Sequence, residues 1–384
     1  MKPASLLKST VANLVVPAAI AVGLFLALEG GCRLAGRARS GVWPRTRAEA
    51  YTEFVRKVGK AYRLHPLLVV TGRPDAVLEV AGKRVVFNAR GQRGTNVLNL
   101  PMPKPPGRFR IVCAGGSTTF DLLAENNEAT WAARLGRALE TRNVDVANAG
   151  FPGWTSLESL LSLEIRDVEL GPDLVVLYSG VNDLQPAGHE PFASDYSAGH
   201  FEILPRVTGA APVPVRLVSR SLFLESLLDR LRPGRPEGVE GFAPAYAWTG
   251  GPKKDDIPAA AVAVYERNLL STIGVASAHG AKVVLVPQVL RVRRGHEARD
   301  TEWIEGWIPG LTVAGARRGL ERYNDVMRKL AREGRALLVE PFPDVDPADG
   351  EFADPCHFSP EGSERFARRL ADAISKSFLD GRPR

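Results

Sequence analysis

A serine follows two glycines at the end of an apolar stretch, in residues 108–120 (RFRIVCAGGSTTF). The apolar residues predict a short buried strand. The small residues after it let the backbone turn sharply and leave the hydroxyl of Ser117 at the carboxyl end of that strand. In an open α/β sheet, ligands bind at this edge. The pattern therefore indicates a serine nucleophile, although a helix N-cap at Ser117 or Thr118 would use the same residues.

A serine nucleophile that works near neutral pH needs a histidine base. Five of the six histidines lie at a predicted helix end, in a linker or in insertions: His65, His189, His200, His279 and His296. The three in insertions have no obvious carboxylate partner. The sixth, His357, stands three residues after Asp354, so that in a turn Asp354 can accept its Nδ1 proton and leave Nε2 for Ser117. The same pair could form half of a metal site, but we find no partner His or Cys at ligand spacing.

Two further predicted strands end in small or amide-bearing residues. One is followed by NAGFPG, which ends at Gly153, and the other by GVND, which contains Asn182. Because the carboxyl ends of parallel strands meet at one edge of a sheet, Ser117, Gly153 and Asn182 can lie close together. The backbone N–H groups of Ser117 and Gly153 and the amide of Asn182 could then stabilise a developing oxyanion. For Asn148 we expect a role in the turn, and for Asp183 a role in bracing its loop.

The elements that must position these residues alternate along the chain. The predicted strands cover residues 108–113, 144–147, 173–178, 282–286 and 336–340, and the main predicted helices cover residues 129–139, 259–279, 317–332 and 360–377. This alternation predicts an α/β fold, a three-layer α/β/α flavodoxin-like domain with a mostly parallel five-stranded sheet.

Two irregular insertions, at about 185–258 and 291–315, interrupt this pattern, and insertions of this kind are usually lids or binding loops. The first contains a predicted amphipathic helix near residues 219–231. The second carries Trp303 and Trp307, which could share one face of a helix or form a platform for substrate.

Residues 9–28 contain no charged side chain and are mostly apolar. At a helical rise of about 1.5 Å per residue, this stretch matches a bilayer core of roughly 30 Å and predicts one transmembrane helix. A cleaved signal peptide fits less well, because no typical cleavage site follows. Lipidation at Cys32 fits poorly too, because Glu29 stands where an aliphatic residue is expected. Glu29 and Arg33 have the spacing of a helical ion pair.

These features predict three parts: an anchor at residues 1–40, a linker segment at 41–107 that packs on the main domain, and a catalytic domain at 108–384. The arginines after the anchor favour a cytoplasmic domain by the positive-inside rule. A lone N-terminal anchor, however, often exports the domain attached to it, and we expect a periplasmic, extracytoplasmic domain.

The net charge of +7 is concentrated at the N-terminus. Residues 1–40 hold five Lys and Arg against one acid, and the remainder holds 45 basic and 42 acidic residues. This balance is not that of a nucleic-acid-binding protein. The three cysteines give no disulfide framework, and Cys113 and Cys356 are expected to be buried thiols.

The blocks GGST, NAGFPG, GVND and DPCH, in this order, resemble the four blocks of the SGNH/GDSL hydrolase superfamily over roughly residues 108–377. NARGQRG, YERNLL and YNDVMRKLA resemble its membrane-anchored bacterial branch. The resemblance implies that Ser117 is the nucleophile and His357 the base, that Asp354 orients His357, and that Gly153 and Asn182 join Ser117 as oxyanion donors. One departure is Gly116, which replaces the aspartate that commonly precedes the serine. We expect this glycine to give the turn more freedom without removing a triad member.

These observations predict a membrane-tethered serine esterase that forms an acyl-enzyme. The resemblance suggests a small-molecule or glycan ester as substrate, with acetyl groups on carbohydrate as the leading hypothesis. Two alternatives stay open: an O-acyltransferase that acts on glycans, and a catalytically silent polysaccharide-binding module. We expect no metal and no organic cofactor, and the membrane as a partner through residues 9–28.

Overall fold

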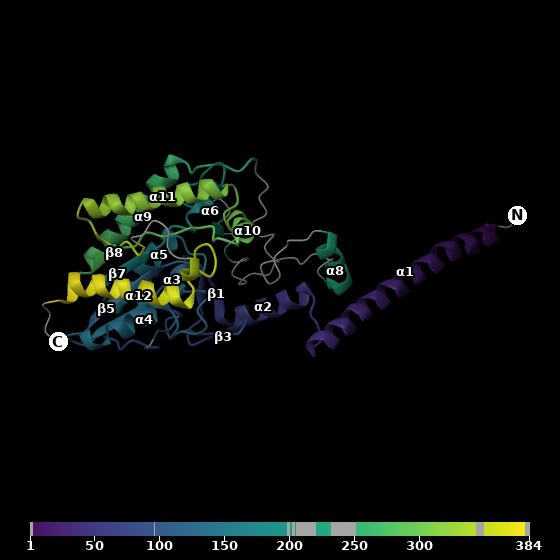
Figure 1. The fold of residues 1–384 in the computed structure, drawn as a ribbon, viewed down its shortest axis with the longest axis horizontal. Helices are drawn as coiled ribbons and strands as arrows, with labels where there is room; N and C mark the ends of the chain where they lie inside the picture. Colours follow the sequence, from purple (N-terminus) through teal and green to yellow (C-terminus); the bar gives the residue numbers. More distant parts are fainter. Residues whose placement is uncertain are drawn as a thin grey trace. The chain divides into compact units, whose positions relative to one another are not determined.

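The computed structural model describes residues 3–95, 97–197, 200–201, 204, 220–231, 251–342 and 349–380 (Figure 1). The chain separates into two compact units. One comprises Met1–Phe54 and Val213–Pro244, and the other comprises Val55–Pro212 and Ala245–Arg384. The larger unit holds the predicted catalytic residues.

The larger unit is built on a five-stranded parallel sheet in the order β6-β5-β7-β8-β9. The strands are β5 (Phe109–Gly115), β6 (Val144–Asn148), β7 (Leu174–Tyr178), β8 (Lys282–Leu285) and β9 (Leu337–Leu338). This order is that of a flavodoxin-like sheet, and the predicted fold is confirmed. After β5 the chain forms β6 on one side of it and then crosses to the other side to form β7. The strand order therefore changes direction between β5 and β7, and a ligand is expected at the carboxyl ends of these two strands.

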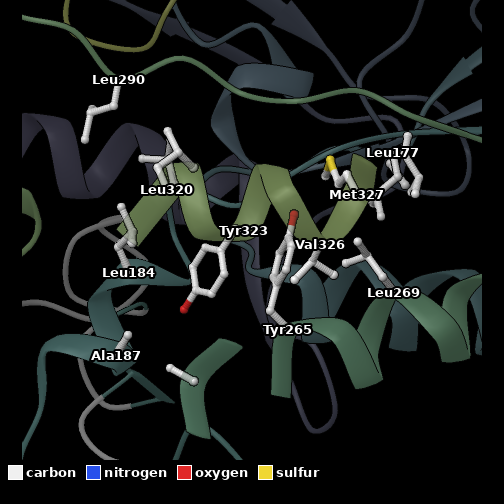
Figure 2. Close-up of a cluster of buried hydrophobic side chains, with 14 of the residues drawn as sticks. Leu177, Leu184, Ala187, Tyr265, Leu269, Leu290, Leu320, Tyr323, Val326 and Met327 are labelled. Atoms are coloured by element: carbon white, nitrogen blue, oxygen red, sulfur yellow. The ribbon is translucent and has the colours of Figure 1, made fainter. Parts of the chain in front are cut away.

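Side chains alternate between the two faces of the sheet, and each face is covered by helices. Val175 and Leu177 of β7 belong to a core formed with α9 (Ala259–Ala278) and α11 (Val313–Arg332). Figure 2 shows part of this core, where the rings of Tyr265 and Tyr323 stack at 4.3 Å. The opposite face packs against α4 (Trp131–Ala138) and α12 (Pro360–Ile374). Because both faces are buried, the central strand β7 (LVVLY) is apolar along its whole length.

Short elements connect these layers. They are α3 (Ser117–Phe120), η1 (Glu140–Arg142), α5 (Ser156–Ser162), η2 (Leu163–Asp167), η3 (Val168–Leu170), α6 (Leu184–Gly188), η7 (Asp349–Glu351) and η8 (Ser375–Leu379). Helix α5 begins with a capping box, in which Thr155 and Glu158 bond each other's backbone N–H groups. This cap explains why the helix begins at Ser156.

The expectation of an irregular segment at 291–315 was wrong in part, because it contains helix α10 (Glu297–Trp307). The buried carboxylate of Asp300 accepts hydrogen bonds from the backbone N–H of Arg293, at 2.8 Å, and from its guanidinium, at 2.9 and 2.7 Å. This pair fixes the first turn of α10 to the segment before it. The two residues are seven positions apart and follow no helical spacing, so the contact could not be read from the pattern.

Two antiparallel hairpins precede the sheet in the larger unit, β1 (Tyr62–His65) with β2 (Val69–Gly72) and β3 (Val77–Val80) with β4 (Lys83–Val86). After them, the buried guanidinium of Arg93 donates to the carbonyl oxygens of Phe120 at 3.0 Å and Asp121 at 2.7 Å. It also donates to Ala124 and Asn126. The segment NARGQRG therefore fixes the loop that follows Ser117.

The smaller unit contains α1 (Pro3–Ser40), the first half of α2 (Arg47–Ala61) and α8 (Leu222–Leu231). Over Leu14–Ser40, α1 is long and apolar enough to cross a membrane, a test that a signal sequence also passes. Glu29 accepts a hydrogen bond from Arg33 Nε at 2.9 Å, as its spacing predicted. The same carboxylate accepts from Ser221 Oγ at 2.8 Å and from the N–H of Phe223 at 3.0 Å, and so caps α8. Most of residues 205–250, within the first predicted insertion, lie outside the described residues.

Candidate active site

Ser117 is the first residue of α3, directly after β5 and Gly116. Gly115 has a φ of 151°, and a Cβ there would overlap the carbonyl oxygen of Tyr178 on the neighbouring strand. The turn therefore requires glycine at this position, for its backbone conformation and for the close approach of β7. The result is a serine that leaves the sheet at the carboxyl end of β5, as the sequence predicted.

Ser117, His357 and Asp354 form one continuous line of hydrogen bonds. The distance from Ser117 Oγ to His357 Nε2 is 2.8 Å, and that from His357 Nδ1 to Asp354 Oδ2 is 2.7 Å. The other oxygen of Asp354 accepts the backbone N–H groups of Cys356 at 3.0 Å and His357 at 2.8 Å. These two bonds fix the carboxylate in a turn, so its orientation does not depend on the imidazole.

The electrostatics of this pair favour a charged imidazole beside a charged carboxylate. Burial alone would lower the pKa of His357, but the Asp354 charge and its hydrogen bond outweigh burial and hold that pKa well above the usual range. Burial alone would raise the pKa of Asp354, and the charge of His357 with the backbone hydrogen bonds holds it below its ordinary value. The arrangement therefore stabilises the imidazolium that forms when His357 takes a proton.

Asn182 lies at the carboxyl end of β7, beside Ser117. Its amide Nδ2 donates to the carbonyl oxygen of Trp154 at 2.9 Å, and its Oδ1 accepts from the indole N–H of Trp307 at 3.1 Å. One amide proton on Nδ2 stays available, because a primary amide carries two donors. Gly153 precedes Trp154 with a φ of 82°. Within the described part of the chain, the backbone N–H groups of Ser117 and Gly153 donate to no acceptor.

These residues surround a small cavity of about 10 Å³, room for roughly one water molecule. It is lined by Gly116, Ser117, Thr118, Trp154, Ser179, Gly180, Val181, Asn182, Gln288, Trp303, Trp307 and Cys356. The lining thus includes two of the three predicted oxyanion donors, whereas the third, Gly153, stands one residue from it. The rings of Trp303 and Trp307 stack at 6.2 Å, and Trp303 meets His357 edge-on at 6.1 Å.

Gln288 is a cavity residue that the sequence analysis missed. Its Nε2 donates to Thr118 Oγ1 at 2.7 Å, and its Oε1 accepts the N–H of Val181 at 2.7 Å. Asn324 holds the backbone of Gln288 through two further hydrogen bonds. Gln288 therefore ties the residue after Ser117 to the residue before Asn182. A signal was present, since Gln288 follows β8 at the edge of the sheet where the other site residues were expected.

Gly116 is closely approached by the side chain of Asn182 and the backbone of Trp154. Its φ is −89°, and a Cβ there would overlap Asn182 Nδ2 and lie 2.8 Å from the carbonyl oxygen of Trp154. The position is therefore closely surrounded by its neighbours, and glycine is needed there for their close approach. An aspartate side chain would not fit in this arrangement.

His200 was expected to lack a carboxylate partner, and this was wrong. Its Nε2 lies 3.2 Å from Glu158 Oε1, and both side chains are buried. Burial alone would raise the pKa of Glu158, but the His200 charge and the hydrogen bonds around it hold that pKa below its ordinary value. Glu158 is 42 positions away and also caps α5, so no local pattern joins it to His200.

Asp183 braces its loop, as expected. Its carboxylate accepts hydrogen bonds from the N–H and the hydroxyl of Ser156, and from the hydroxyl of Tyr196 at 2.9 Å. Burial raises the pKa of Asp183 to about 6. Asn148 also acts in its turn, since its Oδ1 accepts the N–H of Gly150 at 3.1 Å.

The expectation that no partner Cys stands at ligand spacing to the Asp354–His357 pair was also wrong. Ligand atoms of Asp354, Cys356 and His357 all lie within 4.8 Å of one another, with Cys356 Sγ 3.6 Å from His357 Nδ1. Carboxylate, thiolate and imidazole are the ligands that zinc prefers. Burial raises the pKa of the Cys356 thiol, however, and this opposes the thiolate form that a metal ligand needs.

A parallel sheet with a serine, a histidine and an aspartate joined at its carboxyl edge is typical of a hydrolase. The chain belongs to the GDSL-like lipase/acylhydrolase family, whose model matches residues 113–365. It is therefore an enzyme of the SGNH/GDSL hydrolase class, as the four sequence blocks predicted.

Two solved structures are similar to this chain. A GDSL-like lipase from Bacteroides thetaiotaomicron is 15% identical, with a TM-score of 0.39, and the match covers 70% of this chain and 89% of the lipase. A catalytic mutant of an acetylxylan esterase from Geobacillus stearothermophilus is 14% identical, with a TM-score of 0.40, and the match covers 73% of this chain and 95% of the esterase. No curated protein sequence matches the chain.

Proposed function

We propose that this enzyme is a serine esterase in which Ser117 is the nucleophile, His357 the general base and Asp354 the residue that orients His357. The observation that carries this proposal is the unbroken line of hydrogen bonds from Ser117 Oγ through His357 to Asp354, at 2.8 and 2.7 Å. It ends at the carboxyl edge of β5, beside the reversal in strand order where this type of sheet binds ligands.

In the first half of the reaction, Ser117 Oγ attacks the ester carbonyl carbon while His357 Nε2 takes the hydroxyl proton. The intermediate collapses, His357 gives the proton to the departing alcohol oxygen, and the acyl group stays on Ser117. In the second half, His357 takes a proton from water, the resulting hydroxide attacks the acyl carbonyl, and the carboxylic acid leaves. Ser117 regains its proton from His357.

The charges around the site support this sequence. Each attack creates a negative oxygen on the substrate and a positive imidazole on the enzyme. The Asp354 carboxylate stabilises the imidazolium, as the raised pKa of His357 indicates. We propose that the free N–H groups of Ser117 and Gly153 and the second amide proton of Asn182 stabilise the oxyanion.

We further propose a small acyl group, such as the acetyl group of an acetylated carbohydrate. The cavity beside Ser117 is about 10 Å³ and is lined in part by Trp303 and Trp307, and its small size supports a short acyl chain over a long one. The indole rings also offer apolar surface near the nucleophile, where one face of a sugar ring could pack.

We propose that α1 anchors the enzyme in a membrane and that residues 108–384, the hydrolase domain, lie outside the cytoplasm. The exposed apolar surface of α1 supports the anchor. Fusing a reporter that is active only outside the cytoplasm to the C-terminus tests the orientation. Reporter activity is expected, and a signal only from a cytoplasmic reporter would reverse this assignment.

Hydrolysis of aryl acetate, butyrate and octanoate by the full-length chain in detergent tests the activity. We expect acetate to be preferred, and we expect Ser117→Ala to lose at least roughly a thousandfold in kcat, since the nucleophile is removed. Ser271→Ala is the matched control, because Ser271 is exposed on α9. Equal rates for Ser117→Ala and wild type would contradict the proposal. Transfer of labelled acetyl to an added glycan instead of water would identify a transferase.

A further inference from the structure

Trp307 contacts the proposed oxyanion donor Asn182 from a distant part of the chain. It is the last residue of α10, 125 positions after Asn182, and its indole N–H donates to Asn182 Oδ1 at 3.1 Å. On the other side of the amide, Nδ2 donates to the backbone carbonyl of Trp154 at 2.9 Å. The Asn182 side chain is thus held at both ends, by a buried bond to Trp154 and a partly buried bond to Trp307.

These two contacts allow only one orientation of the amide. An indole N–H can only donate and a backbone carbonyl can only accept, so Oδ1 must face Trp307 and one Nδ2 proton must face Trp154. In the flipped orientation, Nδ2 would face the indole N–H and Oδ1 would face the Trp154 carbonyl. Both hydrogen bonds would become repulsive contacts and would leave their polar groups unsatisfied, which disfavours the flipped orientation.

The orientation of this amide decides whether Asn182 can assist the reaction. With Nδ2 directed as observed, its second proton is available beside Ser117, because Nδ2 lies against the position that a Cβ of Gly116, the residue before Ser117, would take. With the amide flipped, the oxygen would occupy that place and would repel the oxyanion. A hydrogen-bond donor stabilises the transition state fully only if it already points at the position of the oxyanion before the negative charge develops.

Trp307 is itself held in place. Its backbone carbonyl accepts Gln185 Nε2 at 3.0 Å, and its ring stacks on Trp303 at 6.2 Å. Gln185 follows Asn182 by three residues in the chain, at the start of α6. The end of α10 is therefore hydrogen-bonded both to the side-chain amide of Asn182 and to α6, the helix that begins two residues after Asn182.

We propose that Trp307 is a positioning residue, which orients the Asn182 amide as an oxyanion donor and thereby links helix α10 to catalysis. This inference rests on the proposed esterase function and extends it. It predicts that losing the indole N–H slows the chemical step and leaves substrate binding largely unchanged.

The test is a double-mutant cycle with Trp307→Phe and Asn182→Ala in the full-length chain, measured as kcat and KM for aryl acetate. Phenylalanine keeps an aromatic ring and removes only the N–H donor and part of the ring. We expect Trp307→Phe to lower kcat roughly 10- to 100-fold, less than the 10²- to 10³-fold typical for removing an oxyanion donor, with KM changed by less than about threefold. In the Asn182→Ala background, the same substitution should change kcat by less than about twofold.

Trp303→Phe is the matched comparison, because it alters the stacked neighbouring ring without removing a bond to Asn182. We expect a smaller loss in kcat than for Trp307→Phe. The inference would be overturned if Trp303→Phe and Trp307→Phe lowered kcat equally. It would also be overturned if Trp307→Phe lowered kcat as much in the Asn182→Ala background as in wild type, and Trp307 would then have a packing role. If Ser117→Ala keeps wild-type activity, the esterase proposal itself fails. If Ser117→Ala and Asn182→Ala are inactive while Trp307→Phe is unchanged, only the inference about Trp307 fails.

Discussion

Replacing Gly116 with alanine tests the packing around the proposed oxyanion donors. A Cβ at this position would meet neighbouring atoms, so we expect the effect of the substitution to come from its added methyl group. That methyl group would overlap Asn182 Nδ2 and lie 2.8 Å from the Trp154 carbonyl oxygen. Since the carbonyl belongs to the backbone, the amide of Asn182 must move.

Moving the amide breaks its bonds to Trp154 and Trp307, and at about 1 kcal/mol each the free energy of unfolding should fall by about 2 kcal/mol. The loss of one oxyanion donor should lower kcat by about 10²–10³-fold. Aryl acetate kinetics and urea unfolding measure the two effects. Gly274→Ala is the control, because no atom lies within 4 Å of its added methyl group on α9, and it should keep wild-type kcat. A Gly116→Ala enzyme with kcat within twofold of wild type would refute this account of the turn.

Three further outcomes are expected. Asp354→Asn should lower kcat roughly 10⁴-fold and shift the acid limb of the remaining activity to lower pH, because the charge of Asp354 raises the pKa of His357; an unshifted limb in the pH–rate profile would contradict this. Because folding raises the pKa of His357, the stabilisation from this group is fully present below pH 6.5, its ordinary pKa, and is lost as the pH rises through the pKa of the folded state. Because folding lowers the pKa of Asp354, the stabilisation from this group is fully present above pH 3.8, its ordinary pKa, and is lost as the pH falls through the pKa of the folded state. The difference in free energy of unfolding between wild type and Asp354→Asn, measured in urea, should therefore be largest between pH 3.8 and pH 6.5. A difference that grows below or above this pH range would contradict the prediction. Gln288→Ala should lower the free energy of unfolding by about 1–3 kcal/mol, since it leaves the buried N–H of Val181 unpaired; unchanged unfolding would argue that another group takes over this bond.

The sheet and its order along the chain could be predicted because the signals are local. Apolar runs such as DLVVLY are typical of strands buried on both faces, and the glycines and amide-bearing residues that follow them mark one edge of a parallel sheet. The residues of the proposed triad could be singled out by the same logic, since His357 stands three residues after Asp354. The prediction weakened at the edge of the sheet, where β9 contains only Leu337–Leu338.

The second layer of the site could not be predicted, because its contacts join distant positions. Trp307 meets Asn182 across 125 positions, and Gln288 meets Thr118 across 170. Trp303 and Trp307 could be placed on one helical face from their spacing, but nothing in the sequence says which polar group that face meets. The same limit applies to Gly116, because the sequence does not distinguish a glycine needed for backbone flexibility from one needed for the close approach of a neighbouring side chain.

The most direct test of the central claim is to treat the full-length chain in detergent with a fluorophosphonate probe and to locate the adduct by mass spectrometry. We expect one adduct, on Ser117, because only this serine lies 2.8 Å from a histidine that an aspartate orients, among the residues the structure describes. The adduct should be lost in His357→Ala and kept in Ser271→Ala. A folded wild-type protein that the probe does not label, or labels equally without His357, would contradict the claim that Ser117 is an activated nucleophile.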